Sequence, residues 1–288
     1  MSRIVYVNGR FKPYATALIH VEDRGFQLAD SIYEVCEVLG GRLVDEERHL
    51  SRLARSLGEI KLSLRHSKRT LGRILRETIR RNRVSDGLVY LQISRGTAPR
   101  DFIFPNPDVA PTIVCIARNI SAEKSAERAM RGIHVKTMVD ERWKRVDIKT
   151  TLLLPSVLAR QAASDEGAYE AWLVDGEGFV TEGAASNAWI VDADRTLITR
   201  SSDDHAILAG VTRSVLLELA EREHVKIVER PFTVIEAKEA QEAFITGAST
   251  LVMPVTKIDE TPIGNGEPGD FTLKLRALFH SQAIISTR

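Results

Sequence analysis

The feature that most constrains this 288-residue chain is a lysine, Lys149, which ends a short stretch of alternating residues. Val146 and Ile148 alternate with Asp147 and Lys149, as in a half-buried strand. Taken alone, such a lysine is most often a solvated surface charge. Two later segments change this interpretation: 181–187 (TEGAASN) carries an acid, and 208–213 (LAGVTR) is a turn that opens a helix. We therefore expect strands and helices that present an amine, a carboxylate and an anion-binding helix start.

The first part of the chain alternates strand-like and helix-like patterns. Asn8-Gly9 and Gly40-Gly41 are pairs that favour two-residue hairpin turns. Asp45 is placed to cap a following helix. The expected elements are strands over 32–39, 88–94 and 112–117, a helix over about 46–60 and a second helix after Ser67. Such a pattern predicts a small antiparallel sheet flanked by helices.

A polar stretch at 118–124 separates this part from the rest of the chain. We expect two domains, a smaller N-terminal α/β domain over 1–119 and a larger, strand-rich C-terminal domain over 120–288. The elements expected in the second are strands over 132–139, 171–174 and 187–191, helices over 155–166 and 212–223, and one more helix that Thr233 and Glu236 open as a capping box. The predicted fold class is a two-domain α+β or α/β protein, with a ligand at the domain interface.

Composition excludes several classes of function. Lys+Arg 40 against Asp+Glu 39 gives a formal net charge of +1, so we expect neither nucleic acid nor an anionic membrane as a partner. Cys36 and Cys115 have no metal-ligand spacing and suggest neither a disulfide framework nor a metal site. The first residues lack the pattern of a signal peptide, and no apolar run approaches membrane-spanning length. We expect a cytoplasmic protein that binds small molecules.

Three further segments narrow the function: Tyr33-Glu34-Val35, 47–53 (ERHLSRL) and 94–100 (SRGTAPR). With the lysine, the acid and the helix turn, they resemble the fold-type IV pyridoxal-phosphate aminotransferases, and within these the D-amino-acid (D-alanine) aminotransferases. The resemblance runs along nearly the whole chain. It implies pyridoxal 5'-phosphate as cofactor, an amino acid and a 2-oxo acid as substrates, and a homodimer. The activity it implies is transfer of the amino group of D-alanine or a related D-amino acid to a 2-oxo acid such as 2-oxoglutarate.

The resemblance gives each polar residue a role around the cofactor. Lys149 is the residue that bonds to the cofactor and moves a proton, so one amine is covalent anchor and general acid/base. Glu182 pairs with the pyridine nitrogen and keeps it protonated. Arg142 is a supporting residue near the cofactor. Asn187 is interpreted as structural, holding the turn that follows Glu182.

A second group is expected to hold the cofactor phosphate. An arginine can bind two phosphate oxygens at once, and a helix start offers free backbone N–H groups. The residues of this group are Arg52, Leu208, Val211, Thr212, Gly247 and Ala248. At the position of Ala248 the D-alanine enzymes have a threonine, so this chain keeps only a backbone contact there. The branched-chain relatives have a glycine before that position, as this chain has with Gly247.

Tyr33 and Arg100 are the expected substrate residues, with the arginine binding the α-carboxylate. The family has a histidine two positions after the arginine, where this chain has Phe102. Phe102 keeps open a branched-chain L-aminotransferase, an (R)-amine transaminase or an aminodeoxychorismate lyase, although Arg100 argues against the amine substrate. From a different class, a catalytically silent cofactor-binding protein is the alternative, and retention of Lys149 and Glu182 weighs against it.

Overall fold

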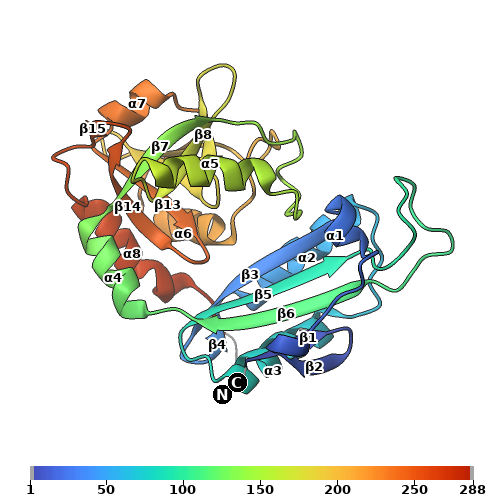
Figure 1. Ribbon diagram of the computed structural model, residues 1–288. Helices are drawn as coiled ribbons and strands as arrows, with labels where there is room; N and C mark the ends of the chain where they lie inside the picture. The colour runs from blue at the N-terminus through green and yellow to red at the C-terminus, as the bar shows by residue number, and fades with distance from the viewer. Residues whose placement is uncertain (1–2, 286–288) are drawn as a thin grey trace. The chain divides into compact units, whose positions relative to one another are not determined.

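The computed structural model describes residues 3–285, which divide into two compact units (Figure 1). Of the described residues, the first unit comprises 3–121, 148–152 and 284–285, and the second comprises 122–147 and 153–283. The chain leaves the first unit after Ser121, close to the boundary predicted after residue 119. It returns to the first unit for the short segment around Lys149, which a single boundary in the sequence did not anticipate.

An antiparallel sheet of six strands, in the order β2-β1-β6-β5-β3-β4, forms the first unit. Helices α2 and α3 pack on one face of this sheet (Figure 1). The strands are β1 (Ile4–Val7), β2 (Arg10–Pro13), β3 (Ser31–Leu39), β4 (Arg42–Leu43), β5 (Gly87–Ser94) and β6 (Thr112–Asn119), and the α-helices are α1 (Arg24–Leu28), α2 (Glu46–Glu59) and α3 (Lys68–Asn82). The three strands and two helices predicted for this part of the sequence are therefore confirmed.

Both predicted hairpin turns are formed. Asn8 and Gly9 have φ angles of 46° and 86° between β1 and β2, and Gly40 and Gly41 have 56° and 75° between β3 and β4. Paired positive φ angles match the twist of the flanking strands, which is why Asn-Gly and Gly-Gly stand there.

The predicted capping role of Asp45 is wrong. Asp45 has a left-handed φ of 53°, and its side chain makes no cap hydrogen bond to α2. Its Oδ1 instead accepts a hydrogen bond from the Ile284 backbone N–H at 3.0 Å, and its own N–H donates to the Ile284 carbonyl. A long-range partner has replaced the local one, which local sequence does not reveal.

A nine-stranded mixed sheet organises the second unit, in the order β12-β11-β10-β13-β14-β7-β8-β9 with β15 beside β14. Its strands are β7 (Ile133–Val139), β8 (Glu170–Val174), β9 (Val180–Gly183), β10 (Asn187–Val191), β11 (Leu197–Thr199), β12 (Ile227–Glu229), β13 (Glu242–Gly247), β14 (Leu251–Ile258) and β15 (Thr261–Pro262). Its helices are α4 (Ala122–Arg131), α5 (Leu154–Asp165), α6 (Val211–Arg222), α7 (Val234–Glu239) and α8 (Asp270–Gln282). Thr233 caps α7 as predicted, because its hydroxyl accepts from the Glu236 N–H at 3.1 Å, but the capping box is only half formed, since the Glu236 carboxylate pairs with Arg230.

Each unit has its own apolar core. In the first, side chains of α2 and α3 meet those of β3, β5 and β6, with Leu53 and Leu75 each 1% exposed. In the second, one core surrounds Trp172 and Phe232, and another lies where α6 and α8 meet the sheet around Trp189 and Phe244. Among residues 3–285, no helix is both long and apolar enough to cross a membrane.

We expect Leu75→Ala to lower the free energy of unfolding by about 2–5 kcal/mol, because it removes buried methyl groups and leaves a cavity. Urea unfolding followed by circular dichroism measures this change. Arg73→Ala, on the exposed side of the same helix, is the control and should change stability by less than about 0.5 kcal/mol. Equal effects of the two substitutions would contradict the assignment of the core face of α3.

Candidate active site

Lys149 lies in an irregular segment that hydrogen-bonds to the start of β3. Its carbonyl accepts from the Tyr33 N–H at 3.0 Å, and the Thr151 N–H donates to the Ser31 carbonyl at 3.2 Å. Ile148, immediately before it, is buried in the core of the first unit. The strand predicted for this stretch is wrong, since the contact with β3 amounts to a single bridge at Thr150 before α5 begins. The segment is nevertheless fixed on both sides of the lysine.

The amine of Lys149 lies over an aromatic face. Its Nζ is 4.3 Å from the centroid of the Tyr33 ring, and Tyr33 stacks on Tyr90 with 5.6 Å between ring centroids. An ammonium group is attracted to such a face. The Tyr90 hydroxyl donates to Gln92 Oε1 at 2.7 Å, which fixes the second ring. The structure therefore brings together two of the predicted residues, Lys149 and Tyr33.

Arg52 belongs to a buried charged cluster with Glu34 and His49, all in the first unit. Its Nε and Nη2 each lie 2.8 Å from an oxygen of Glu34, and His49 Nδ1 lies 2.8 Å from Glu34 Oε2. Burial alone would raise the pKa of Glu34, but the charge and hydrogen bonds of Arg52 and the hydrogen bond of His49 hold that pKa far below its usual range. Glu34 thus fixes the guanidinium of Arg52, whose contact with a phosphate stays a prediction.

Arg100 and Phe102 lie on an exposed loop after β5. The guanidinium carbon of Arg100 is 5.5 Å from the Phe102 ring centroid, and Phe102 is 81% exposed. The loop is anchored on both sides of Arg100: the Ala98 N–H donates to the Glu22 carbonyl at 3.3 Å, and buried Arg24 donates to the Asp101 carbonyl at 2.6 Å. The backbone on both sides of Arg100 is therefore fixed by hydrogen bonds.

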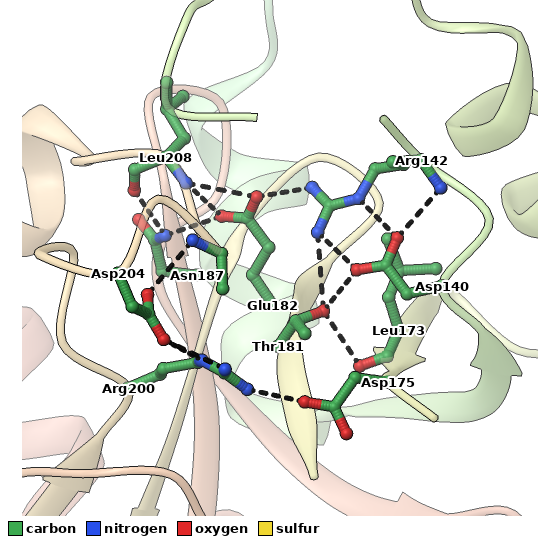
Figure 2. Close-up of polar contacts among 11 residues, drawn as sticks. Asp140, Arg142, Leu173, Asp175, Thr181, Glu182, Asn187, Arg200, Asp204 and Leu208 are labelled. Carbon is green, nitrogen blue, oxygen red and sulfur yellow. Dashed lines mark hydrogen bonds and ion pairs between the residues drawn. The ribbon is translucent and has the colours of Figure 1, made fainter. Parts of the chain in front are cut away.

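In the second unit, Glu182 at the end of β9 accepts hydrogen bonds from three other segments (Figure 2). Arg142 Nη1 donates to its Oε1, Asn187 Nδ2 donates to its Oε2 at 2.8 Å, and the Leu208 N–H lies 3.2 and 3.1 Å from its two oxygens. Donors of this kind stabilise the anionic carboxylate. Asn187 also donates to the Leu208 carbonyl at 2.9 Å, so its side chain holds the Leu208 loop to Glu182 and not, as predicted, the turn that follows Glu182.

The guanidinium of Arg142 is itself held by the carboxylate of Asp140. Its Nε and Nη2 donate to the two oxygens of Asp140 at 2.9 and 2.8 Å, and the Thr181 hydroxyl donates to Asp140 Oδ2 at 2.7 Å (Figure 2). Burial lowers the pKa of Arg142, but the hydrogen bonds of Asp140 and the charge of Glu182 outweigh it and raise that pKa above its usual value. Arg142 is therefore a permanent cation beside Glu182.

Helix α6 begins at Val211 with the chemistry of an anion site. Its N-cap, Gly210, supplies no side-chain cap, and its first turn contains no acidic residue. The N–H groups at a helix start and the helix dipole both favour an anion. Gly210 is also required sterically, because a Cβ there would lie 2.1 Å from Asn187 Oδ1.

Gly247 ends β13 and lies against the turn that follows Glu182. A Cβ on Gly247 would be 3.4 Å from the Ala185 carbonyl oxygen and 3.9 Å from Ser186 Cα. Asn187 follows this turn, and its side chain lies against Gly210, the N-cap of α6. Gly247 and the start of α6 therefore both lie next to the segment 185–187 in the second unit.

Sequence analysis missed several residues that the structure adds to these clusters. Glu34, His49, Asp140 and Thr181 each contact a predicted residue or its direct partner. Two signals were present: Glu34 adjoins Tyr33, and Thr181 adjoins Glu182. The pairing itself joins positions 18 and 41 residues apart, which sequence spacing does not predict.

The donors of the two units, each taken by itself, fit different parts of pyridoxal phosphate. A phosphate suits the uncapped start of α6, and the Glu182 carboxylate suits a protonated pyridine nitrogen. Lys149 supplies an amine. Within residues 3–285, no group of three or more His, Cys, Asp or Glu side chains is arranged to hold a metal ion.

Comparison with known proteins agrees with this chemistry. The model of the amino-transferase class IV family matches residues 31–258. The D-alanine aminotransferase of Staphylococcus haemolyticus is 37% identical over 276 residues, which covers 96% of each chain. The chain therefore belongs to the class IV aminotransferase family.

Solved structures confirm the fold. The branched-chain amino acid aminotransferase of Escherichia coli superposes with a TM-score of 0.89 at 21% identity, covering 98% of this chain and 94% of its own. The branched-chain aminotransferase of Thermoproteus uzoniensis with norvaline gives 0.86 at 21% identity, covering 99% of each chain. The predicted fold type, a two-domain fold-type IV aminotransferase, is confirmed.

We expect Glu34→Gln to reduce the dependence of stability on pH in the acid range. The pKa of Glu34 is lowered in the folded state from an ordinary value of 4.5, so its contribution is complete above that value and is lost as the pH falls below it. Urea unfolding at pH 6, 4 and 3 should show a smaller loss of stability in the variant than in the parent.

Glu77→Gln is the contrast. The pKa of Glu77 is lowered to about 2 by Arg80 and Arg81, but these ion pairs are exposed, so solvent screening makes the effect of the substitution smaller. Parallel curves for parent and Glu34→Gln would contradict the electrostatic role of this cluster.

Proposed function

We propose that this protein is a pyridoxal-phosphate-dependent D-amino-acid aminotransferase that transfers the amino group of D-alanine or a related D-amino acid to a 2-oxo acid such as 2-oxoglutarate. The observation that carries the proposal is the Glu182 carboxylate, held by Arg142, Asn187 and the Leu208 N–H three residues before the uncapped start of α6. Such an arrangement suits a ligand that carries a basic ring nitrogen and a phosphate.

When bound, pyridoxal phosphate supplies an electron sink for the electron pair released at the substrate α-carbon. Lys149 is assigned covalent attachment and the transfer of the α-proton, because it offers a primary amine at a fixed backbone position. Glu182 is assigned to hold a proton on the ring nitrogen, and Arg142 keeps Glu182 oriented. Val211 and Thr212 would donate to the phosphate, with Arg52, Gly247 and Ala248 as further residues that would contact it.

Sequence similarity favours a D-amino acid as substrate, and Arg100 favours a substrate that carries a carboxylate. D-Alanine aminotransferases are 34–37% identical to this chain over nearly its whole length. Arg100 lies on a braced loop and is assigned to the α-carboxylate, which D- and L-amino acids share, with Tyr33 assigned to orient it. A guanidinium fork binds a carboxylate with directional hydrogen bonds.

Branched-chain L-amino acids are the alternative substrates. Phe102 replaces the histidine expected beside Arg100 and makes this loop less polar. Product analysis with D-alanine, L-leucine or (R)-1-phenylethylamine in turn, each with 2-oxoglutarate, distinguishes the candidates. Glutamate formed with D-alanine alone supports the proposal, and glutamate formed only with L-leucine rejects it.

The expected homodimer has support in the first unit. Leu18, Val21, Phe26, Phe102 and Ile103 are all more than 70% exposed. Hydrogen bonds between segments 22–24 and 96–101 join them into one surface. Exposed apolar surface of this kind is typical of an interface, and we assign it to a second copy of the chain. Sedimentation of the parent and of Phe102→Asp tests this assignment, and a cytoplasmic location stays a prediction.

Lys149→Ala should abolish turnover and the visible absorbance of bound pyridoxal phosphate together, because both depend on one amine. Lys144→Ala, which removes an exposed lysine from the same stretch of chain, should leave both unchanged. Absorbance titration and a coupled 2-oxo-acid assay measure the two properties. Multiple turnover by the Lys149→Ala variant at the parental rate would reject the site.

Arg100→Leu should raise KM for D-alanine by about one to two orders of magnitude, because a charged hydrogen bond is worth roughly 1.5–3 kcal/mol. It should change KM much less for (R)-1-phenylethylamine, which has no carboxylate. Arg118→Leu, which removes an exposed arginine from β6, is the matched control. Phe102→His should shift selectivity toward the carboxylate substrate. An unchanged ratio of the two specificities in Arg100→Leu would mean that other residues bind the carboxylate.

A further inference from the structure

Arg200, directly after β11, joins the turn that precedes the strand of Glu182 to the loop that carries Leu208 (Figure 2). Its Nη1 donates to Asp175 Oδ2 at 2.9 Å, and its Nε donates to Asp204 Oδ2 at 3.0 Å. The Arg200 side chain is only 13% exposed. One guanidinium group thus bridges two carboxylates, and we call these three residues the Arg200 clamp.

One arm of the clamp reaches the hairpin that carries Glu182. Asp175 follows β8, and its Oδ1 accepts from the N–H groups of Glu177 and Phe179 at 3.1 and 3.0 Å. The next strand is β9, which ends with Thr181, Glu182 and Gly183. Asp175 therefore fixes the turn from which the Glu182 strand starts.

The other arm reaches the loop that carries Leu208. Residues 201–209 form neither a helix nor a strand, so hydrogen bonds must define their path. Asp204 Oδ1 accepts from the Ala206 N–H at 3.0 Å, two residues before the N–H that donates to Glu182. The Arg200 carbonyl also accepts from Arg213 of α6 at 2.9 Å, which ties the clamp to that helix.

We propose that Arg200 is a positioning residue: with Asp175 and Asp204 it holds the Leu208 N–H on Glu182 and fixes the loop that leads to the start of α6. The inference rests on the proposed function for its consequence, which is tighter binding of pyridoxal phosphate. An isolated exposed ion pair contributes little, but a largely buried guanidinium shared by two carboxylates restrains both of them.

The test compares three variants of the full chain. Arg200→Met removes the clamp, and Arg200→Lys keeps the charge without the fork. Arg230→Met is the matched control, because it removes a nearby arginine of the same unit that pairs with Glu236 and not with the loop. Two properties are measured: amide hydrogen exchange over 201–209 in protein free of cofactor, and the dissociation constant of pyridoxal phosphate from tryptophan fluorescence.

We expect Arg200→Met to speed exchange at Leu208 about tenfold and to raise the dissociation constant about tenfold, because a donor to a charged carboxylate is displaced. Arg200→Lys should give a smaller change in both, and Arg230→Met should match the parent. Parental exchange in Arg200→Met overturns the inference, and so does faster exchange with a parental dissociation constant. A parent that does not bind pyridoxal phosphate rejects the proposed function instead, and exchange alone then decides whether Arg200 holds Leu208.

Discussion

The hydrogen bonds that converge on the Glu182 carboxylate organise the second unit. They draw in Arg142 from the segment after β7, Asn187 from β10, and the Leu208 N–H from the loop before α6. A carboxylate that is 4% exposed must find such partners, because burying it without them would cost several kcal/mol. The partners also restrict each other: Asn187 leaves no room for a Cβ at residue 210, so the N-cap of α6 must be glycine. The hydrogen bonds to one carboxylate thus fix the chain directly before α6.

The first unit also depends on a buried carboxylate. Glu34 is shared by the guanidinium of Arg52 and the ring of His49, and its low pKa follows from these partners. The cluster joins β3 to α2, while the backbone of β3 also binds the Lys149 segment through Tyr33. Strand β3 therefore holds both Arg52, through the Glu34 side chain, and Lys149, through the Tyr33 N–H. Substitution within β3 is expected to disturb both together.

Sequence similarity and structural similarity point to different kinds of aminotransferase. Relatives at 34–37% identity are D-alanine aminotransferases, whereas the solved structures with high TM-scores include branched-chain enzymes at 20–24% identity. Backbone shape is shared because it depends on buried apolar patterns that many sequences satisfy. Under the proposed function, substrate choice depends on a few exposed side chains such as Arg100 and Phe102, which belong to neither core. Fold similarity therefore leaves open what these two positions decide.

The sequence by itself determined the local elements and the chemistry of single residues. Periodicity and turn residues predicted three strands of the first unit, both hairpin turns and the start of α7, because these depend on neighbours in the chain. They also singled out Lys149, Glu182 and the helix start at Val211. Tertiary structure decided the rest. Asp45 bonds to Ile284 and does not cap α2. The stretch around Lys149 forms a single bridge and not a strand. The partners of Arg52, Arg142 and Leu208 lie far away in the sequence. The physical reason is that a buried charge takes the partner that the fold brings within about 3 Å, and sequence spacing does not record that distance.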